Sequence, residues 1–427
     1  MDRPVVRRKA VTQSRRERGV VFLLLVGIVF LGAAALFLGT RNLNSAALDN
    51  QRNIAQNLQK AKQSLIAYAV NYADHQSGGG AGFGHFPCPD TDNNGSPQGF
   101  NCAPNEIGRL AIAWETNTDK AQVLYPFAED APRRFWYVTS QQFRPVLSAD
   151  TRVNPDTLAE LSVDGLGDIV AVVIDPGPPL TGQDRPSNDP ADYLEGGNED
   201  GDTTFFTSST GEFNDRVIFI TRDEIMPLVN TRVLYYVFQT LEAMDDVDPR
   251  FLPYAAFLGD TDDDDGNLAC IADQLVGFLP VDFRPSTAPD GVLGCDVPTN
   301  QAFQPWVRSN QWHHHIYYQV DPNCTRITGC NPGAVSIEVT NNGVLYSPQS
   351  FMVAMFGSPL GAQDRSDPVP PDHSPADYLD SVESGDGDLE FVFEPLDANN
   401  NDVALSCHLR TGVSCLCQMH PEIPLCI

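Results

Sequence analysis

Two short acidic loops have the residue types and spacing of a calcium site. In the sequence DTDNNG, Asp90, Asp92 and Asn94 place carboxylate and carboxamide oxygens at alternate positions, and Gly95 follows. This order is typical of the first half of an EF-hand loop. Asn101 stands where such a loop needs its bidentate Glu, so the match covers half of the motif.

The second loop, DTDDDDG, repeats the arrangement with Asp260, Asp262 and Asp264, although its glycine comes one position later. Calcium is therefore the one cofactor that the sequence suggests, at the millimolar concentrations found outside cells. The alternative is that both loops are solvated acidic turns without an ion.

Ten cysteines predict an exported body, because oxidising compartments favour disulfides. Three bonds are predicted in the body, and they join Cys88 to Cys102, Cys270 to Cys295, and Cys324 to Cys330. Four more cysteines are expected to form disulfides in the tail, with a pairing that stays open: Cys407, Cys415, Cys417 and Cys426. A zinc site that includes His408 and His420 is the alternative for these four, and oxidising conditions disfavour it.

Recognisable catalytic motifs are absent. The chain contains no G-x-S-x-G, no H-E-x-x-H and no phosphate-binding G-x-x-x-x-G-K-[ST]. We therefore expect no enzyme, with a membrane-tethered hydrolase as the rival if scattered Ser, His and Asp residues converge in space. The histidines 313–315 lie in a strand-like stretch, where alternate side chains face opposite ways, so we expect a rim or surface strand.

Charge is distributed unevenly along the 427 residues. The formal net charge is -29, but residues 1–41 carry eight Lys or Arg and two Asp or Glu, which leaves -35 on the remainder. So acidic a body repels phosphate backbones, and nucleic acid is excluded as a partner. The length predicts two or three domains, and 33 Gly with 33 Pro predict a loop-rich body with short strands.

An uncharged segment near the amino terminus is long enough to cross a membrane. Val20–Leu38 has nineteen residues without a charge, and a helix needs about 20 to span the hydrocarbon layer. The basic residues before it predict a cytoplasmic amino terminus and an exported body. A cleaved secretory signal is the weaker alternative, because Asn44 to Ala46 or Ala47 offers only a poor cleavage site.

The same helix is expected to continue beyond the membrane. Apolar residues recur at helical spacing on one side of the following segment: Leu43, Ala47, Ile54, Leu58, Ala61, Leu65, Ala69 and Tyr72. No Pro or Gly interrupts residues 40–76, and the sequence SGGGAGFG then ends the helix. An independent helix after a separate anchor is the alternative.

A basic leader ending in Gly19, followed at once by the apolar half of a long helix, resembles the amino terminus of type IV prepilins and type II secretion pseudopilins. The stretch from SLIAYAV to FPCPDTDNNG also resembles large pilin-like proteins of this group. The resemblance implies that a prepilin peptidase cuts after Gly19 and that Val20 becomes the methylated terminus. One departure is that Leu24 stands where the family usually has Glu.

The resemblance implies a pilin-like subunit of a type IV pilus or secretion pseudopilus. The departure at Leu24 and the bulk of the body predict a minor subunit, at the tip or at initiation. The resemblance also implies a single-pass inner-membrane protein, with a periplasmic or extracellular body, that contacts lipid before assembly and other pilin-like subunits afterwards. A membrane-anchored adhesin or binding protein that never polymerises is the alternative.

The chain also resembles itself. Gln-Asp-Arg and Pro-Ala-Asp-Tyr-Leu occur in the same order in residues 175–205 and 357–391, which predicts two tandem copies. In this alignment Leu258 takes the place of Cys88, which leaves Cys270 for Cys295. The expected fold is α+β, in which a helix packs on an antiparallel sheet and a second helix-plus-sheet copy follows. The expected segments are a leader (1–19), the membrane half (20–39) and amphipathic half (40–77) of the helix, and two globular copies (78–220 and 221–427).

Overall fold

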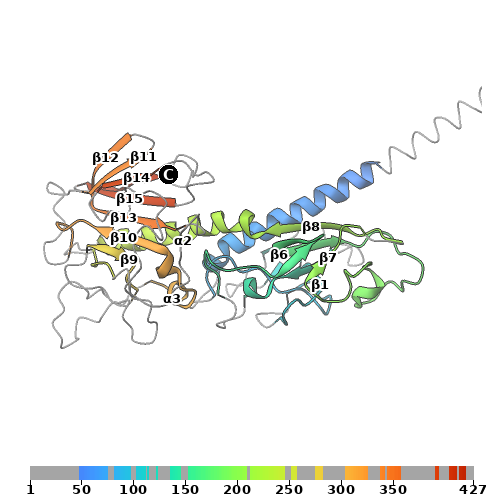
Figure 1. The fold of residues 1–427 in the computed structure, drawn as a ribbon. Helices are drawn as coiled ribbons and strands as arrows, with labels where there is room; N and C mark the ends of the chain where they lie inside the picture. Colours follow the sequence, from blue (N-terminus) through green and yellow to red (C-terminus); the bar gives the residue numbers. More distant parts are fainter. Residues whose placement is uncertain are drawn as a thin grey trace, which may run out of the picture. The chain divides into compact units, whose positions relative to one another are not determined.

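The computed structural model describes residues 48–75, 81–97, 102–111, 113–114, 122–123, 135–145, 152–208, 212–245, 252–256, 275–281, 303–325, 337–341, 344–356, 390–393, 403–410 and 413–419. The chain divides into two compact units, residues 1–59 and 60–427. Within the second unit, we call residues 60–221 the first region and residues 222–427 the second region. The described residues form a loop-rich α+β fold (Figure 1).

The first region begins inside a helix over residues 48–71, which continues as the 3-10 turn η1 (Tyr72–His75). Ala61, Leu65, Ala69 and Tyr72 are at most 2% exposed. Their spacing of three or four residues places them on one face of the helix. The predicted apolar stripe is therefore buried in this part of the helix.

A six-stranded sheet forms the core of the first region. Its strands run in the order β1-β4-β6-β5-β7, and β8 also pairs with β6. Their bounds are β1 (Gly108–Arg109), β4 (Trp136–Thr139), β5 (Leu161–Val163), β6 (Leu166–Asp175), β7 (Thr204–Phe205) and β8 (Arg216–Thr221). The apolar run of β6 is buried on both faces from Ile169 to Ile174, so β6 is the centre of this sheet. Two short 3-10 turns lie in the connections, η3 (Gln141–Phe143) and η5 (Pro190–Asp192).

The hairpin between β5 and β6 is set by its turn residues. Val163 pairs with Leu166, which leaves Asp164 and Gly165 as a two-residue connection. Both have positive φ angles, 51° and 83°, as the turn type favoured in tight hairpins requires. Thr207 donates its backbone N–H to the Asp164 carboxylate at 3.0 Å, which fixes the chain after β7 beside this turn.

Strand β8 leads directly into helix α2 (Arg222–Asp245), the first element of the second region (Figure 1). Thr221 and Glu224 form a capping box, in which the Glu224 N–H donates to Thr221 Oγ1 at 3.2 Å and the Thr221 N–H donates to Glu224 Oε2 at 3.0 Å. Lys62 Nζ also donates to Glu224 Oε1 at 2.6 Å, and Arg232 pairs with Asp74. These two ion pairs join α2 to the helix of the first region, with both helices running in the same direction.

The second region contains a five-stranded antiparallel sheet in the order β16-β15-β13-β10-β9. Its bounds are β9 (Val276–Phe278), β10 (Ile316–Val320), β13 (Phe351–Met355), β15 (Val403–Arg410) and β16 (Val413–Met419). A three-stranded sheet contains β11 (Ile337–Asn341), β12 (Val344–Gln349) and β14 (Glu390–Phe393). In the first region, a separate hairpin pairs β2 (Ala113–Trp114) with β3 (Gln122–Val123).

The interpretation of the three histidines as a surface strand is wrong. They belong to the 3-10 turn η6 (Trp312–His315), which follows the short helix α3 (Pro305–Ser309), and β10 begins only at Ile316. His313 is fully buried and His315 is 5% exposed. Gln311 turns the chain with a φ of 59°, and burial lowers the pKa of His313 well below its usual value. The turn, rather than strand alternation, sets where these side chains point.

Candidate functional site: the disulfide-closed acidic loop

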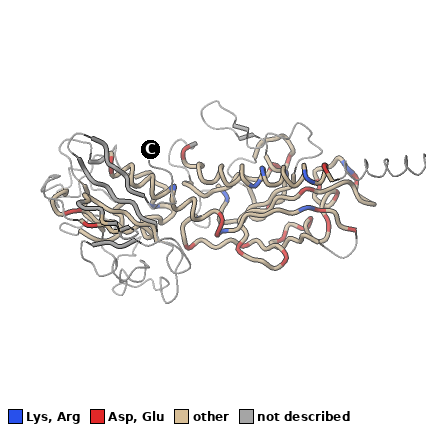
Figure 2. The backbone as a smooth tube through the Cα atoms, turned by 90° about the horizontal axis from the view of Figure 1, so that it is seen from above, with Lys and Arg blue, Asp and Glu red and all other residues tan. Residues whose placement is uncertain are grey.

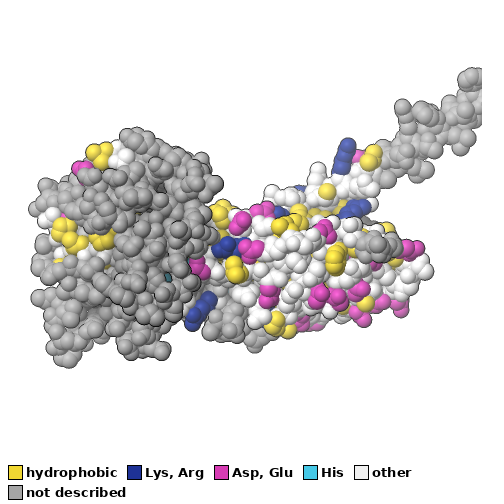
Figure 3. Space-filling model, viewed as in Figure 1, with side chains coloured by type: hydrophobic (Ala, Val, Ile, Leu, Met, Phe, Trp, Pro, Cys, Tyr) yellow, Lys and Arg dark blue, Asp and Glu magenta, His cyan; other side chains and the backbone are white. Residues whose placement is uncertain are grey.

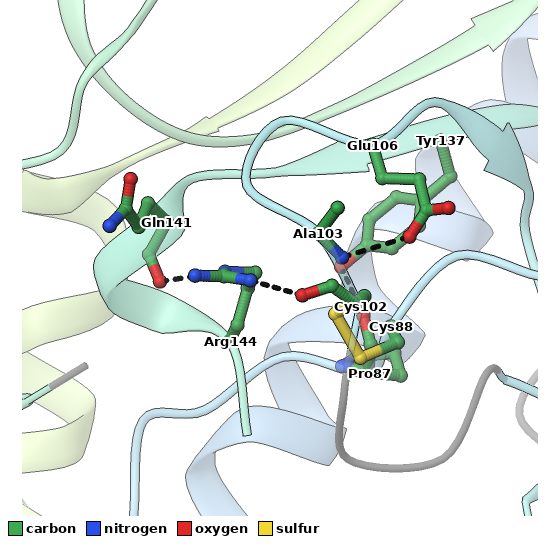
Figure 4. Close-up of a disulfide and its surroundings, with 8 residues drawn as sticks. All are labelled: Pro87, Cys88, Cys102, Ala103, Glu106, Tyr137, Gln141 and Arg144. Atoms are coloured by element: carbon green, nitrogen blue, oxygen red, sulfur yellow. Dashed lines mark hydrogen bonds between the residues drawn. A yellow bond between two sulfur atoms is a disulfide. The ribbon is translucent and has the colours of Figure 1, made fainter. Parts of the chain in front are cut away.

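The predicted bond between Cys88 and Cys102 is present and buried. Its sulfur atoms are 2.08 Å apart and its Cα atoms 5.6 Å apart, and the two residues are 0% and 3% exposed. Figure 4 shows the bond beside Arg144 and Tyr137. The disulfide closes the ends of the segment that contains the first acidic loop.

Hydrogen bonds to the backbone fix this disulfide in place (Figure 4). Tyr137 donates its hydroxyl to the Pro87 carbonyl at 3.1 Å, and Arg144 donates to the carbonyl of Cys102 and, at 3.1 Å, to that of Gln141. Burial raises the pKa of Tyr137 and lowers that of Arg144. A neutral phenol and a guanidinium thus act here as donors to carbonyl groups, which is a structural role.

The carboxylates of the first acidic loop accept hydrogen bonds from their own backbone. Asp90 is fully buried, and its two oxygens accept the N–H groups of Asn94 at 3.1 Å and Gly95 at 2.7 Å. Asp92 Oδ1 also accepts from the Asn94 N–H at 3.2 Å, and Asn94 Oδ1 accepts from the Ser96 N–H at 2.7 Å. The bonds of Asp92 and Asn94 are those of Asx turns, and the Asp90 bonds span four and five residues. The loop is thus ordered by the oxygens that calcium would need.

The described residues contain no group of three or more His, Cys, Asp and Glu that could hold a metal ion. Asp260, Asp262 and Asp264 lie outside the described residues. The calcium prediction therefore stays open for both loops.

In the first region, the repeated motif forms a network of hydrogen bonds centred on Arg185, which we call the polar tie. Its guanidinium donates to four backbone carbonyls, those of Pro176, Gly177, Asp192 and Tyr193, at 2.7–3.2 Å. It also donates to Gln183 Oε1 at 2.7 Å and lies 4.5 Å from the centre of the Tyr193 ring. One side chain thus joins the two ends of the segment of residues 176–193.

A second arginine contacts the same tyrosine ring. The Arg109 guanidinium is 4.1 Å from the Tyr193 ring centre and 3.8 Å from that of Trp136, distances typical of cation–π contacts. Arg109 is 2% exposed. The identity of Arg185 and Tyr193 between the repeats signals this cluster in the sequence, whereas nothing in the sequence marks Arg109.

The remaining cysteines are placed only in part. Cys324 is fully buried and disulfide-bonded, and its predicted partner Cys330 lies outside the described residues. In the tail, the strand register sets Cys407 opposite Cys417, and opposite residues of antiparallel strands have Cα atoms close enough for a disulfide. Cys270, Cys295 and Cys426 lie outside the described residues.

The predicted processing and assembly residues Gly19, Val20 and Leu24 also lie outside the described residues. Among the residues that the structure does describe, no helix combines the length and apolar character needed to cross a membrane. Acidic side chains are spread over the face of the first region shown in Figure 3, and many of them lie on its loops (Figure 2).

Comparison with known proteins identifies no relative: no family model matches the chain, and no curated protein and no solved structure matches it. What the chain does must therefore be argued from its own residues.

Proposed function

We propose that the chain is a minor pilin-like subunit of a type IV pilus or a type II secretion pseudopilus. A prepilin peptidase removes residues 1–19, and the new terminus at Val20 is methylated. The segment Val20–Leu38 anchors the protein in the inner membrane until assembly, with the body outside the cytoplasm. The observation that carries this proposal is the basic leader ending in Gly19 directly before an uncharged helical segment.

The described end of the helix supports the proposal. A pilin-like subunit needs a helix that is one element from the assembly half into the body. The residues 48–71 are helical, and the buried stripe from Ala61 to Tyr72 packs into the first region. The carboxyl end of this helix is thus part of the core of the body.

We further propose that the two regions are tandem copies of one unit. Support comes from the order of their strands, because β1-β4-β6-β8 in the first region corresponds to β9-β10-β13-β15 in the second. A helix precedes each set, and the matched motifs of residues 175–205 and 357–391 occupy the same place between strands. A subunit with two copies on one helix is bulky for every step of a filament.

Leu24 supports a place at the tip or at initiation. In the resembling family, a Glu at this place offsets the terminal ammonium of a neighbouring subunit, and an unpaired buried charge costs several kcal/mol as an order of magnitude. Leu24 provides no such partner, but it suits a helix with no subunit ahead of it. Few copies per filament follow, together with a smaller major pilin.

Mass spectrometry of the protein from native membranes tests this function. We expect a methylated amino terminus at Val20. We also expect that a Gly19→Lys variant keeps its leader and is not incorporated into filaments. A start at Met1 or after Ala46 would overturn the proposal in favour of a non-polymerising anchored protein. Leu24→Glu tests the position, since we expect this variant along the filament shaft while the parent chain is confined to few copies.

A further inference from the structure

Two buried carboxyl groups meet where a long connection crosses the first sheet. Asp215 immediately precedes β8 and is 5% exposed, while Glu195 follows η5 and is 9% exposed. Their side chains are in hydrogen-bonding contact. Glu195 belongs to the segment of residues 176–202, so this contact ties the segment to the sheet.

Of the four carboxyl oxygens of the pair, three accept hydrogen bonds from the described residues and one does not. Glu195 Oε1 accepts from Gln183 Nε2 at 2.7 Å, and Glu195 Oε2 accepts from the Asn214 N–H at 3.0 Å. Asp215 Oδ2 accepts from the Glu195 N–H and from Asn198 Nδ2, both at 3.0 Å. Asp215 Oδ1 is buried and receives no hydrogen bond from the part of the chain that the structure describes.

We propose that Asp215 carries a proton on Oδ1 and donates it to the Glu195 carboxylate, and that this acid pair is a latch that opens when the proton is lost. Two carboxylates in contact and out of water cannot both be ionised without a large electrostatic cost. A protonated Oδ1 becomes a donor, and the neighbouring Glu195 carboxylate offers oxygens that accept. No other atom of the pair needs a new partner.

The surrounding charges agree with this assignment. Burial, followed by the charge of Glu195, raises the pKa of Asp215 to about 7, against hydrogen bonds from Asn198 and the Glu195 N–H that lower it. On the neighbouring strand β6, the acid Asp175 lies opposite Arg216, and the charges of Arg216 and Arg185 act on that group. Glu195 is the charged group that acts on Asp215 among the described residues.

The direction of the pH dependence follows from the raised pKa of Asp215. The closed form keeps a proton that the open form loses at the pKa of an ordinary carboxyl group, so the latch is strongest in acid. It weakens as the pH rises to about 7 and changes no further above that value. Opening frees Tyr193 and Leu194, which pack against Trp136 in the core.

Hydrogen exchange of the full chain in detergent, followed by mass spectrometry, tests the latch. We expect protection factors of residues 176–202 to fall about tenfold between pH 6 and pH 8, as a carboxyl group with this pKa requires. Asp215→Asn should keep the segment protected at every pH, because its amide still donates to Glu195. Glu195→Gln should also remove the transition, and Asp200→Asn, an exposed change in the same segment, should leave it intact.

An infrared band of a protonated carboxyl group at pH 6, absent from Asp215→Asn, would support the proposal without depending on the exchange data. A flat profile in the parent chain, or a transition that persists in both Asp215→Asn and Glu195→Gln, would overturn it. Closure of the segment at pH 8 by millimolar calcium in the parent chain would also overturn it, since the pair would then be a cation site.

Discussion

The first and second regions use the same order of antiparallel strands but differ in the continuity of their central strand. In both, a hairpin with a two-residue connection lies next to the central strand in the sequence: Val163 pairs with Leu166 at the start of β6, and Asn341 pairs with Val344 in the hairpin that precedes β13. In both, a later strand pairs in parallel with the first strand of that hairpin, β7 with β5 and β14 with β11. The shared order therefore includes the hairpin and the strand that pairs with it in parallel, as well as the antiparallel strands of the core.

The difference lies in the continuity of the central strand. In the first region, β6 runs unbroken over ten residues, so the hairpin remains part of the main sheet. In the second region, β12 ends at Gln349 and β13 begins at Phe351, and the hairpin belongs to a separate three-stranded sheet. Pro348, inside β12, has no N–H for the ladder, and the pairing of β11 with β12 shifts register beside it. The interruption at Ser350 separates the hairpin from the five-stranded sheet.

In the first region, the polar tie supplies hydrogen bonds that the very short outer strands β5 and β7 do not provide. β5 and β7 have three and two residues, so few ladder bonds hold the connection. Arg185 and the pair of Glu195 and Asp215 supply bonds in their place. In the second region β11 and β14 are longer, and we expect less dependence on side-chain bonds there.

The largest expected effect comes from removing the helix of the first region. A chain beginning at residue 80 lacks Leu65 and Tyr72, and each fully buried side chain of this size contributes about 1.5–3 kcal/mol. We expect it to aggregate, while a chain beginning at residue 48 is monodisperse in size-exclusion chromatography and has near-ultraviolet circular dichroism. If the shorter chain is equally well folded, the helix is not a core element and the correspondence with α2 fails.

A smaller effect is expected at the arginines of the two motifs. Arg185→Ala removes several hydrogen bonds from a charged donor, so we expect a loss of about 2–4 kcal/mol in the free energy of unfolding, measured by urea titration. Arg365→Ala is the matched change in the second motif, and we expect a smaller loss because the strands there are longer. Arg52→Ala, on an exposed helix surface, is the control for lost charge. Equal losses at Arg185 and Arg365 would contradict the proposed difference.

Much of this architecture can be predicted from the sequence because the patterns that indicate it are local. The stripe from Ala61 to Tyr72, the α+β class, and the bond between Cys88 and Cys102 follow from periodicity, composition and spacing. The repeated Arg185 and Tyr193 mark the place of the polar tie, although not its geometry. These features depend on residues near one another in the chain.

The features that the sequence does not reveal depend on contacts between distant segments. The burial of His313 follows from the turn at Gln311 and from packing, which no alternation pattern encodes. Arg109 is unremarkable in the sequence, yet its guanidinium contacts the rings of both Trp136 and Tyr193. Asp215 has a raised pKa because the fold buries it and, in addition, places Glu195, twenty residues earlier, beside it.

The smallest expected effect concerns calcium at the first acidic loop. The Asp90 oxygens already accept the N–H groups of Asn94 and Gly95, so we expect the melting temperature to be the same in chelator and in millimolar calcium. Asp90→Asn should cost about 1–3 kcal/mol in either condition, because one buried acceptor becomes a donor facing an N–H. Asp92→Asn, at an exposed position, should cost less. If calcium raises the melting temperature of the parent chain but not of Asp90→Asn, the loop is a metal site. If calcium raises the melting temperature of Asp90→Asn but not that of Asp262→Asn, the calcium site lies in the second region. The two acidic loops would then differ in function, and the difference between the two regions would extend beyond the continuity of their central strands.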